Sequence, residues 1–394
     1  MQPQSIAIIG AGTAGLATAA LLAEQGHHIT LIERAEALAP VGAGLLLQPT
    51  GLSVLKDMGL YQAMLGYGAR VDALIGHTRD GRRIMNTAYR SLDDHSHGLG
   101  IHRASLCHVL DCHLQTLPHE RLMGCTVSAV EVAEAHTTVI ADNAGEPCRR
   151  SFDAVLIANG SHSRLRPTDW TRYDRLYPWG AMWAIQPMVE SFAAPLLQQR
   201  YHRASQMVGI LPTGCCPEQP NQPLASFFWS LPVAQMRHWQ HRDFDFSGWR
   251  DQALQLWPQL ETLLAPLTHQ DQLLPATYRD VIMHRGGKPA GHHWRCRPCH
   301  EPATGSGGKH GPARCPGHWP GGCGIRRLAP GLASLSPSTG TTDSLLSAYE
   351  PLADPRLPVA QSHGIPRTGS VLSSHGKGAM ATHTDGEDLS LIHI

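Results

Sequence analysis

The sequence predicts an α/β protein in which a first domain with a parallel sheet is followed by a second, α+β domain and an irregular tail. Near the amino terminus, two short apolar runs flank a glycine-rich turn and a segment whose apolar residues have helical spacing, which is the order of a β-α-β unit. Residues 167–284 then alternate short apolar runs with turn residues. From about residue 286, Gly and Pro rise from about 13% to about 28% of positions, which is typical of irregular sequence.

Length and composition set limits on the class of protein. The 394 residues are enough for two domains, at the usual ~100–200 residues each. The 32 basic residues balance the 32 acidic ones, so the charge gives no reason to expect binding to nucleic acid or to an anionic membrane surface. No apolar run approaches the ~20 residues of a membrane span, and ten cysteines in a chain of this length do not indicate a secreted disulfide scaffold. We therefore expect a cytoplasmic protein, whose oligomeric state the sequence does not specify.

The amino terminus carries a strand, a glycine-rich turn and a helix in succession. Ser5–Ile9 is a short apolar run, as expected of a buried parallel strand. Apolar residues then recur at helical spacing until Gly26, which is placed to end the helix. A second apolar strand, Ile29–Ile32, delivers Glu33 and Arg34. Between the first strand and the helix lies a complete G-x-G-x-x-G sequence formed by Gly10, Ala11, Gly12, Thr13, Ala14 and Gly15.

These residue types suit the binding of a dinucleotide. Gly10 allows a tight turn, Gly12 lets the backbone approach a pyrophosphate, and Gly15 lets the helix pack closely on the strand. The N–H groups at the start of the helix would then meet the pyrophosphate. Glu33 follows 18 residues after the last glycine and can accept a hydrogen bond from an adenosine ribose hydroxyl. The sequence therefore predicts a Rossmann-like dinucleotide site and leaves FAD and NAD both open at this point.

Three segments further along the chain resemble the flavin-dependent aromatic-ring hydroxylases, the family of the hydroxybenzoate, salicylate and ubiquinone-pathway hydroxylases. Residues 42–60 are similar to the segment that passes near the flavin ring in that family, and the resemblance implies that Gly44 contacts the cofactor. Residues 101–106 are similar to the family's helix start with a conspicuous arginine, here Arg103, and the resemblance implies that this residue contacts FAD. The first domain is therefore expected to be an FAD-binding domain over residues 1–166.

The third segment, residues 152–166, resembles the family's strand and turn in which an Asp-Gly pair precedes a Ser and an Arg. In the family that turn serves both FAD and a transiently bound nicotinamide cofactor. Here Asn159 stands before Gly160 where the family has Asp. Asparagine keeps the turn propensity and an acceptor oxygen but lacks the charge. We therefore expect this difference from the family to affect the coupling to the nicotinamide cofactor more than the binding of FAD.

The resemblance implies an FAD-dependent monooxygenase with no universal catalytic triad, so the catalytic residues are left unassigned. In the family NAD(P)H reduces FAD, O2 adds to the reduced flavin, and a flavin hydroperoxide transfers one oxygen atom to a small aromatic or similar ring. A second G-x-G-x-x-G, as expected in reductases with two dinucleotide sites, is not found in this sequence. The alternatives are a non-oxygenating FAD-dependent oxidoreductase of the same fold and an inactive, truncated relative.

Residues 167–284 are expected to form the substrate-binding domain. Strands are predicted over residues 181–185, 207–211 and 224–231, and an amphipathic helix over residues 247–267. Pro212-Thr213-Gly214 is expected in a turn between strands. This segment also holds most of the aromatic side chains. Most of them are expected in the core, with one or two lining the substrate pocket.

Residues 285–394 are expected to be a non-native tail. The family has a Gly-Asp-Ala-Ala-His motif shortly after residue 280, and the written sequence lacks it. The codons of His292 to His318, shifted by one nucleotide, can spell this motif in order, which predicts a frameshift between about Met283 and Lys288. Residues 389–394 resemble a translated transposon end used in library preparation and are expected to be adapter-derived.

The tail also contains a Cys-x-x-Cys pair, Cys296 and Cys299, with histidines and further cysteines nearby. Such spacing would ordinarily suggest zinc and an appended interaction module. In a frameshifted segment these residues are by-products of shifted Ala and His codons, so no metal site is predicted.

Overall fold

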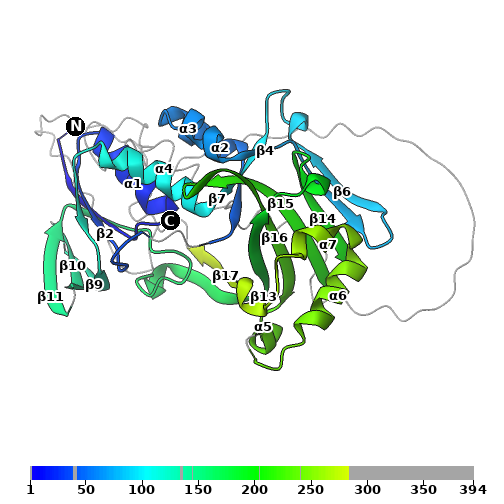
Figure 1. Ribbon diagram of the computed structural model, residues 1–394. Helices are drawn as coiled ribbons and strands as arrows, with labels where there is room; N and C mark the ends of the chain where they lie inside the picture. The colour runs from blue at the N-terminus through cyan, green and yellow to red at the C-terminus, as the bar shows by residue number, and fades with distance from the viewer. Residues whose placement is uncertain are drawn as a thin grey trace, which may run out of the picture.

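The computed structural model describes residues 2–38, 42–133, 136–143, 145–203, 205–239 and 241–283. The predictions made for residues 284–394, namely the frameshift, the adapter-derived end, the irregular tail and the zinc alternative, lie outside these ranges. In the described chain, two sheet-based parts lie side by side, and Figure 1 shows the first around β1 and β2 and the second around β13 to β16. Among the described helices, none is long and apolar enough to cross a bilayer.

The first part is built on a parallel sheet with the strand order β12-β1-β2-β8. Its strands are β1 (Ser5–Ile9), β2 (His28–Ile32), β8 (His119–Leu122) and β12 (Ala154–Ile157). The helices packed with it are α1 (Thr13–Glu24), α2 (Pro49–Asp57), α3 (Tyr61–Tyr67) and α4 (Arg103–Gln115). An antiparallel sheet also packs against it, formed by β9 (Cys125–Val132), β10 (Thr137–Asn143) and β11 (Glu146–Phe152).

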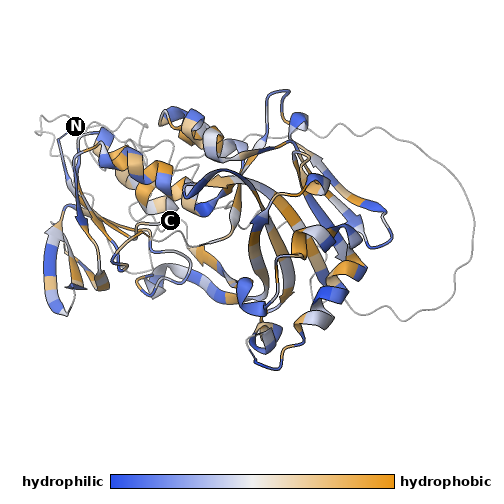
Figure 2. Cartoon of the chain, in the orientation of Figure 1, coloured by the Kyte–Doolittle hydropathy of each residue, from blue (hydrophilic) through white to orange (hydrophobic). Residues whose placement is uncertain are grey.

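Strand β1 is buried on both of its faces. Ile6 and Ile8 belong to the core that includes α1 and α4, and Ala7 and Ile9 belong to the core shared with β9 to β11. A strand covered on both faces has no position for an exposed polar residue, which explains the continuous apolar run. Figure 2 shows hydrophobic residues along α1 and β1 accordingly. The predicted strand, helix and second strand are confirmed, and α1 stops just before Gly26, whose φ is +84°.

The second part is a seven-stranded mixed sheet with the order β17-β13-β16-β15-β14-β5-β6. Its strands are β5 (Ala73–Thr78), β6 (Arg83–Ala88), β13 (Thr171–Pro187), β14 (Leu196–His202), β15 (Gln206–Cys216), β16 (Gln219–Pro232) and β17 (Leu274–Met283). All neighbours are antiparallel except β14 and β5, which are parallel. Residues 73–88 lie before position 166 in the sequence, yet they complete the sheet whose other strands lie within residues 167–284.

The two faces of this sheet pack against different partners. Phe227 and Trp229 point to a core formed with the helices α5 (Val233–Trp239), α6 (Phe246–Leu256) and α7 (Glu261–Leu264). Phe228 points the opposite way, into a core with Leu46 and Val71. Those two residues belong to a small sheet with the order β3-β7-β4, made of β3 (Gly44–Leu47), β7 (Gly98–His102) and β4 (Ala69–Val71). Short 3-10 helices complete the fold at Tyr89–Ser91, Thr168–Trp170, Glu190–Phe192, Pro258–Leu260 and Gln270–Gln272.

The three strands predicted for the second part are confirmed and lie within β13, β15 and β16. Two other expectations for this part are wrong. The helix expected over residues 247–267 is broken after Leu256, because Pro258 cannot donate a backbone hydrogen bond and holds Trp257 in an extended conformation (φ −149°, ψ 89°). Pro212-Thr213-Gly214 lies inside β15 as an irregularity rather than in a turn between strands. Gly214 has φ +68° there, which suits a bulge.

Candidate functional site

The glycine loop between β1 and α1 depends on close backbone contacts at two of its glycines. Gly10 has φ +105°, and a Cβ atom placed on it would lie 2.6 Å from the carbonyl oxygen of Ala158. A Cβ atom on Gly15 would lie 1.7 Å from the carbonyl oxygen of Gly10. The backbone N–H of Gly10 donates to the carbonyl of Ile32 over 2.7 Å. The loop can therefore pack on β2 and β12 only if both positions are glycine.

Gly12 has no such packing reason to be glycine. A Cβ atom there would meet nothing within 4 Å, and its backbone is ordinary (φ −76°, ψ −174°). It is the N-cap of α1, and the first turn of this helix has neither a side-chain cap nor an acidic residue. The first helical hydrogen bond runs from Leu16 N–H to Gly12 C=O at 2.9 Å, so the N–H groups of residues 13–15 have no acceptor within the helix. Open space at Gly12, next to N–H groups without an acceptor in the helix, fits a pyrophosphate such as the one that FAD carries.

Glu33 lies at the end of β2 and faces this loop. Its Oε2 accepts a hydrogen bond from Ala11 N–H at 2.7 Å, and its Oε1 accepts one from Ala35 N–H at 3.0 Å. Because a carboxylate oxygen can accept more than one hydrogen bond, both atoms retain capacity for a ribose hydroxyl. Arg34, the next residue, is exposed.

The Asn159–Gly160 turn follows β12 and meets the same loop. A Cβ atom on Gly10 would lie 2.8 Å from the Cα atom of Asn159, and Gly160 has φ +86°. The glycine loop, Glu33 and this turn therefore converge at the carboxyl ends of β1, β2 and β12. That is the edge at which α/β sheets bind nucleotides.

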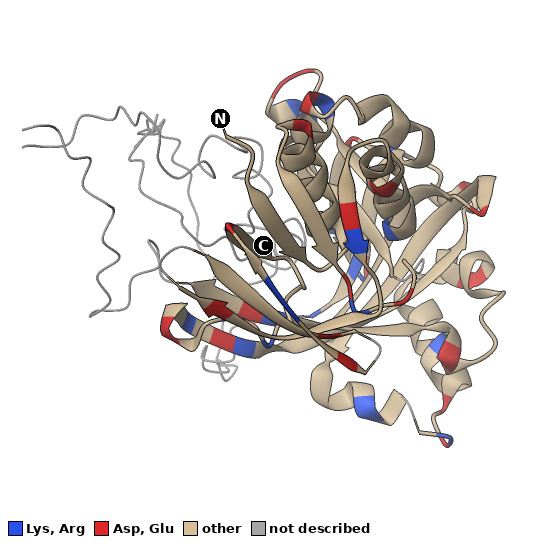
Figure 3. Ribbon diagram, turned by 90° about the vertical axis from the view of Figure 1, so that its left-hand side faces the viewer, with Lys and Arg blue, Asp and Glu red and all other residues tan. Residues whose placement is uncertain are grey.

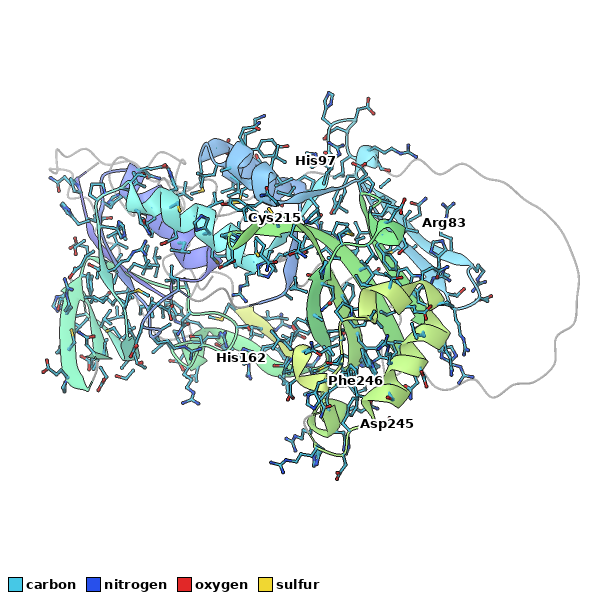
Figure 4. All side chains as sticks on the ribbon, in the orientation of Figure 1. Arg83, His97, His162, Cys215, Asp245 and Phe246 are labelled. Carbon is cyan, nitrogen blue, oxygen red and sulfur yellow. The ribbon has the colours of Figure 1, made fainter. Side chains whose placement is uncertain are left out.

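Behind the turn, an ion cluster ties the loop after β12 to the second sheet. Arg166 donates to the carbonyl of Ser161 at 3.0 Å and forms an ion pair with Asp174 in β13. Arg279 in β17 donates to the same carboxylate at 2.6 Å. Burial opposes ionisation of Asp174, but the hydrogen bond from Arg279 and the charge of Arg166 outweigh it, and the pKa of the carboxyl is lowered. Figure 4 labels His162, which lies in this loop.

Arg103 is the first residue of α4 and packs on the segment before β3. Its N–H donates to Ala43 C=O at 3.4 Å, and a Cβ atom on Gly42, which has φ +131°, would lie 2.8 Å from its Cδ. One turn further along α4, Cys107 Sγ lies 3.6 Å from Thr13 Oγ1 at the start of α1. The Arg103 region is thus joined to the glycine loop through the two helices.

The same helix also contacts the second sheet. Ser105 Oγ donates to the carbonyl of Cys215 at 2.7 Å, at the place labelled Cys215 in Figure 4. Helix α4 therefore has its amino-terminal end fixed between the two parts of the fold.

Gly44 has a packing role that the sequence did not reveal. A Cβ atom there would lie 2.1 Å from Thr213 Cγ2 and 2.3 Å from Ser226 Oγ. Its N–H donates to Ser226 Oγ at 2.8 Å in the interior. Contacts with β15 and β16 are sufficient to explain glycine here, and its contact with a cofactor stays a prediction.

A cavity of about 350 Å³ lies between the segment before β3 and the second sheet. This volume is at the lower end of the range for small-molecule sites. Strand β13 forms one wall, where the indole of Trp183 packs on the ring of Phe228 at a tilt of 32°, with 4.7 Å between the ring centroids. The lining residues are Gly42, Ala43, His102, Trp183, Ala184, Ile185, Gln272 and Leu274.

Two residues that line the cavity, His102 and Trp183, are not among the site residues that the sequence motifs predict. His102 directly precedes the predicted Arg103, and its position next to that arginine was the available signal. Trp183 belongs to the aromatic group of which one or two were expected at the pocket. Only the alternation of side chains along β13, with Met182 in the helical core and Trp183 on the opposite face, identifies which aromatic residue faces the cavity.

Charged and metal-binding side chains were compared over the described residues only. Figure 3 shows Lys and Arg interspersed with Asp and Glu on the face in view. Within the ranges that the structure describes, no group of three or more His, Cys, Asp and Glu side chains is placed to hold a metal ion.

Comparisons with known proteins agree with this geometry. A family model described as FAD binding domain matches residues 4–222. A 3-amino-4-hydroxybenzoate 2-monooxygenase of Streptomyces cremeus is 35% identical over 175 residues, which cover 41% of this chain and 41% of that protein. The chain therefore matches about two fifths of the length of that curated relative.

Solved structures share the fold at low sequence identity. The tetrameric form of 2-methyl-3-hydroxypyridine-5-carboxylic acid oxygenase superposes with a TM-score of 0.58 at 17% identity, over 73% of this chain and 74% of that one. PqsL of P. aeruginosa, in complex with 2-aminobenzoylacetate, superposes with a TM-score of 0.57 at 20% identity, over 70% of this chain and 73% of that one. These matches cover most of the described residues and place both parts of the molecule in one known fold.

Proposed function

The chain belongs to the FAD binding domain family, and on this basis we propose that it is an FAD-dependent monooxygenase that hydroxylates a small aromatic ring with NAD(P)H and O2. The observation that carries the proposal is the cavity of about 350 Å³ between the segment before β3 and the second sheet, walled by Trp183. The curated relative named above is a monooxygenase of an aminohydroxybenzoate, which supports an aromatic substrate.

The residues on the carboxyl edge of the parallel sheet would hold FAD. The open space at Gly12 and the free N–H groups of α1 suit the pyrophosphate. Glu33 would bind the ribose. The remaining members of the proposed cofactor site are Gly10, Ala11, Thr13, Ala14, Gly15, Arg34, Gly44, Arg103, Asn159 and Gly160.

The residues that line the cavity indicate which steps would depend on FAD and which on the protein. Bound FAD, reduced by NAD(P)H, would supply the activation of O2 and the transfer of one oxygen atom to the ring, with the other leaving as water. The protein's own part is to bind and orient the ring and to exclude bulk water. Trp183, Ile185 and Leu274 provide apolar surface for this. A cytoplasmic location remains the expectation that the cysteine content supports.

The test is isotope incorporation with the full chain. The protein is saturated with FAD and incubated with NADPH or NADH, a panel of phenols and aminophenols, and ¹⁸O2. We expect one ¹⁸O atom in a ring product and a rate of NAD(P)H consumption that rises with substrate concentration. NAD(P)H oxidation without incorporation would instead identify a non-oxygenating oxidoreductase, and failure to bind FAD would identify an inactive relative.

A further inference from the structure

We propose that His102 donates a hydrogen bond from Nε2 to an oxygen atom of the aromatic substrate, and so selects rings that carry a hydroxyl or carbonyl group facing α4. This inference rests on the proposed function for the identity of the ligand as a substrate. His102 would be a positioning residue that neither the sequence motifs nor the similarity to known proteins assigns.

The position of the His102 ring is fixed by the helix that follows it. His102 is the last residue of β7 and the N-cap of α4, and its Nδ1 accepts a hydrogen bond from Ala104 N–H at 3.2 Å. N-caps are usually Ser, Thr, Asp or Asn, so an imidazole in this role is unusual. The side chain is largely buried, with 8% of the residue exposed.

The cap also determines which ring nitrogen carries the proton. Because Nδ1 accepts a hydrogen bond, its lone pair is occupied, and the proton of the neutral ring is on Nε2. Burial lowers the pKa of the imidazole, and the charge of Glu218 opposes this only in part, so the ring is neutral near pH 7. His102 therefore offers a donor at Nε2, on the ring edge that points away from Ala104.

The other polar side chains of the cavity wall are already engaged. The indole N–H of Trp183 donates to Tyr278 OH at 3.2 Å. Gln272 Oε1 accepts from Thr268 N–H at 2.7 Å and from His269 N–H at 2.9 Å, while its Nε2 is 3.4 Å from Pro266 C=O. Among the described lining residues, His102 Nε2 is the side-chain donor for which no hydrogen bond to another described residue is found.

The wall opposite supplies the complementary surface. Trp183 is held by Phe228 behind it and by Tyr278 at its N–H, so its ring is a rigid platform on which an aromatic substrate can stack. A donor and an aromatic plane in one cavity of about 350 Å³ define the ligand class: a single ring with an acceptor oxygen. Rings in which a methyl group replaces that oxygen would leave the donor unpaired.

The test compares the binding of phenol with that of toluene, a ring of similar size without the oxygen. Binding is measured by calorimetry on the full chain saturated with FAD and without NAD(P)H, so that no turnover occurs. In His102→Ser the hydroxyl keeps the cap of α4, but no donor reaches the cavity. The preference for phenol over toluene should fall about 3- to 10-fold, as expected for the loss of one hydrogen bond.

Two further variants make the result specific. His102→Gln retains a donor of similar reach and should recover most of the preference. His108→Ser removes an exposed histidine of the same helix and should leave the preference unchanged. Thermal melting checks that each variant is folded, and if His102→Ser is not, His102→Asn offers a second capping residue with a shorter side chain.

An unchanged phenol preference in a folded His102→Ser overturns the inference. If that variant instead weakens FAD binding and leaves the preference intact, the partner of Nε2 is the cofactor, which also overturns it. Failure of the proposed function is recognised separately, because ¹⁸O incorporation in the unaltered chain does not depend on this comparison.

Discussion

The carboxylate of Glu33 accepts a hydrogen bond from the backbone N–H of Ala11 at 2.7 Å, so the acidic residue that follows β2 is bonded directly to the glycine loop that follows β1. A residue expected only to contact a ribose therefore also shapes the loop next to it. Removing its side chain should affect both the loop and the nucleotide site.

Replacing Glu33 with Ala is expected to weaken FAD binding about 10- to 100-fold, since hydrogen bonds to a charged group contribute roughly 1.5–3 kcal/mol. Titration of the full chain with FAD, followed by flavin fluorescence, measures this. Glu36→Ala is the matched control, because Glu36 is an exposed acid of the same loop. Equal losses in the two variants would show that general charge, rather than the hydrogen bonds of Glu33 to the loop and to the ribose, is responsible.

Gly12 and Gly15 should respond in opposite ways to replacement by Ala. A Cβ atom on Gly12 meets no protein atom within 4 Å, so Gly12→Ala should change the stability of the FAD-free chain by no more than about 0.5 kcal/mol yet weaken FAD binding. A Cβ atom on Gly15 would lie 1.7 Å from Gly10 C=O, so Gly15→Ala should destabilise the FAD-free chain itself.

Urea unfolding without FAD and FAD titration together separate these two effects. Gly66→Ala serves as a control outside the nucleotide site, since a Cβ atom there also meets nothing. If Gly12→Ala binds FAD as tightly as Gly66→Ala does, the space in front of α1 is not the pyrophosphate site.

Gly44→Ala is expected to destabilise the chain by about 1–3 kcal/mol through overpacking, because the new methyl group would lie 2.1 Å from Thr213 Cγ2. Adding Thr213→Ser removes that methyl and should recover part of the loss, so the two changes should be non-additive. Urea unfolding of the single and double variants gives the coupling. Strict additivity would mean that the contact is not the cause.

Asp174 should make stability depend on acid pH. Its pKa is lowered in the folded chain from an ordinary value of 3.8. The stabilisation of the folded chain by ionised Asp174 is therefore complete above about pH 3.8. It is lost as the pH falls through the lower pKa of the folded state. Asp174→Asn should cost about 1–3 kcal/mol at pH 7 because the guanidinium of Arg166, with 4% of its side chain exposed, loses a charge partner.

Urea unfolding of Asp174→Asn and of the unaltered chain between pH 7 and pH 3 gives the difference in their free energies of unfolding. This difference should become smaller as the pH falls toward 3. Asp72→Asn removes the exposed pair with Arg70 and should cost about 0–1 kcal/mol. A pH-independent difference for Asp174→Asn would contradict the ionic explanation.

Local signals in the sequence were sufficient to predict the arrangement of residues at the carboxyl edge of the parallel sheet. The apolar run of β1, the glycines and the position of Glu33 all lie within 33 consecutive residues, so spacing alone predicts their arrangement. The break at Pro258 was also a local signal, but the apolar periodicity on either side of it concealed the change of direction. Periodicity describes which residues are buried and does not require one continuous helix.

Long-range features could not be read in the same way. The assignment of Trp183, rather than another aromatic residue, to the cavity depends on which face of the second sheet packs against β3 and β7. The packing of Gly44 against Thr213 joins residues that no sequence pattern relates. No sequence pattern predicts that His102 caps α4, because an imidazole is an unusual helix cap, and the hydrogen bond from Ala104 N–H that fixes its ring exists only in the folded chain.

The parallel pairing of β14 with β5 has a consequence for how the molecule can be dissected. Leu196 pairs with Ala73, so the second sheet is incomplete until a hairpin from the first part of the chain is inserted at its edge. A gene fragment that starts at residue 167 would expose β14 as an open edge, a template for aggregation. The two parts are therefore not independent modules: they must be expressed, exchanged or recombined together, and assembly of this edge must await contacts between distant parts of the polypeptide.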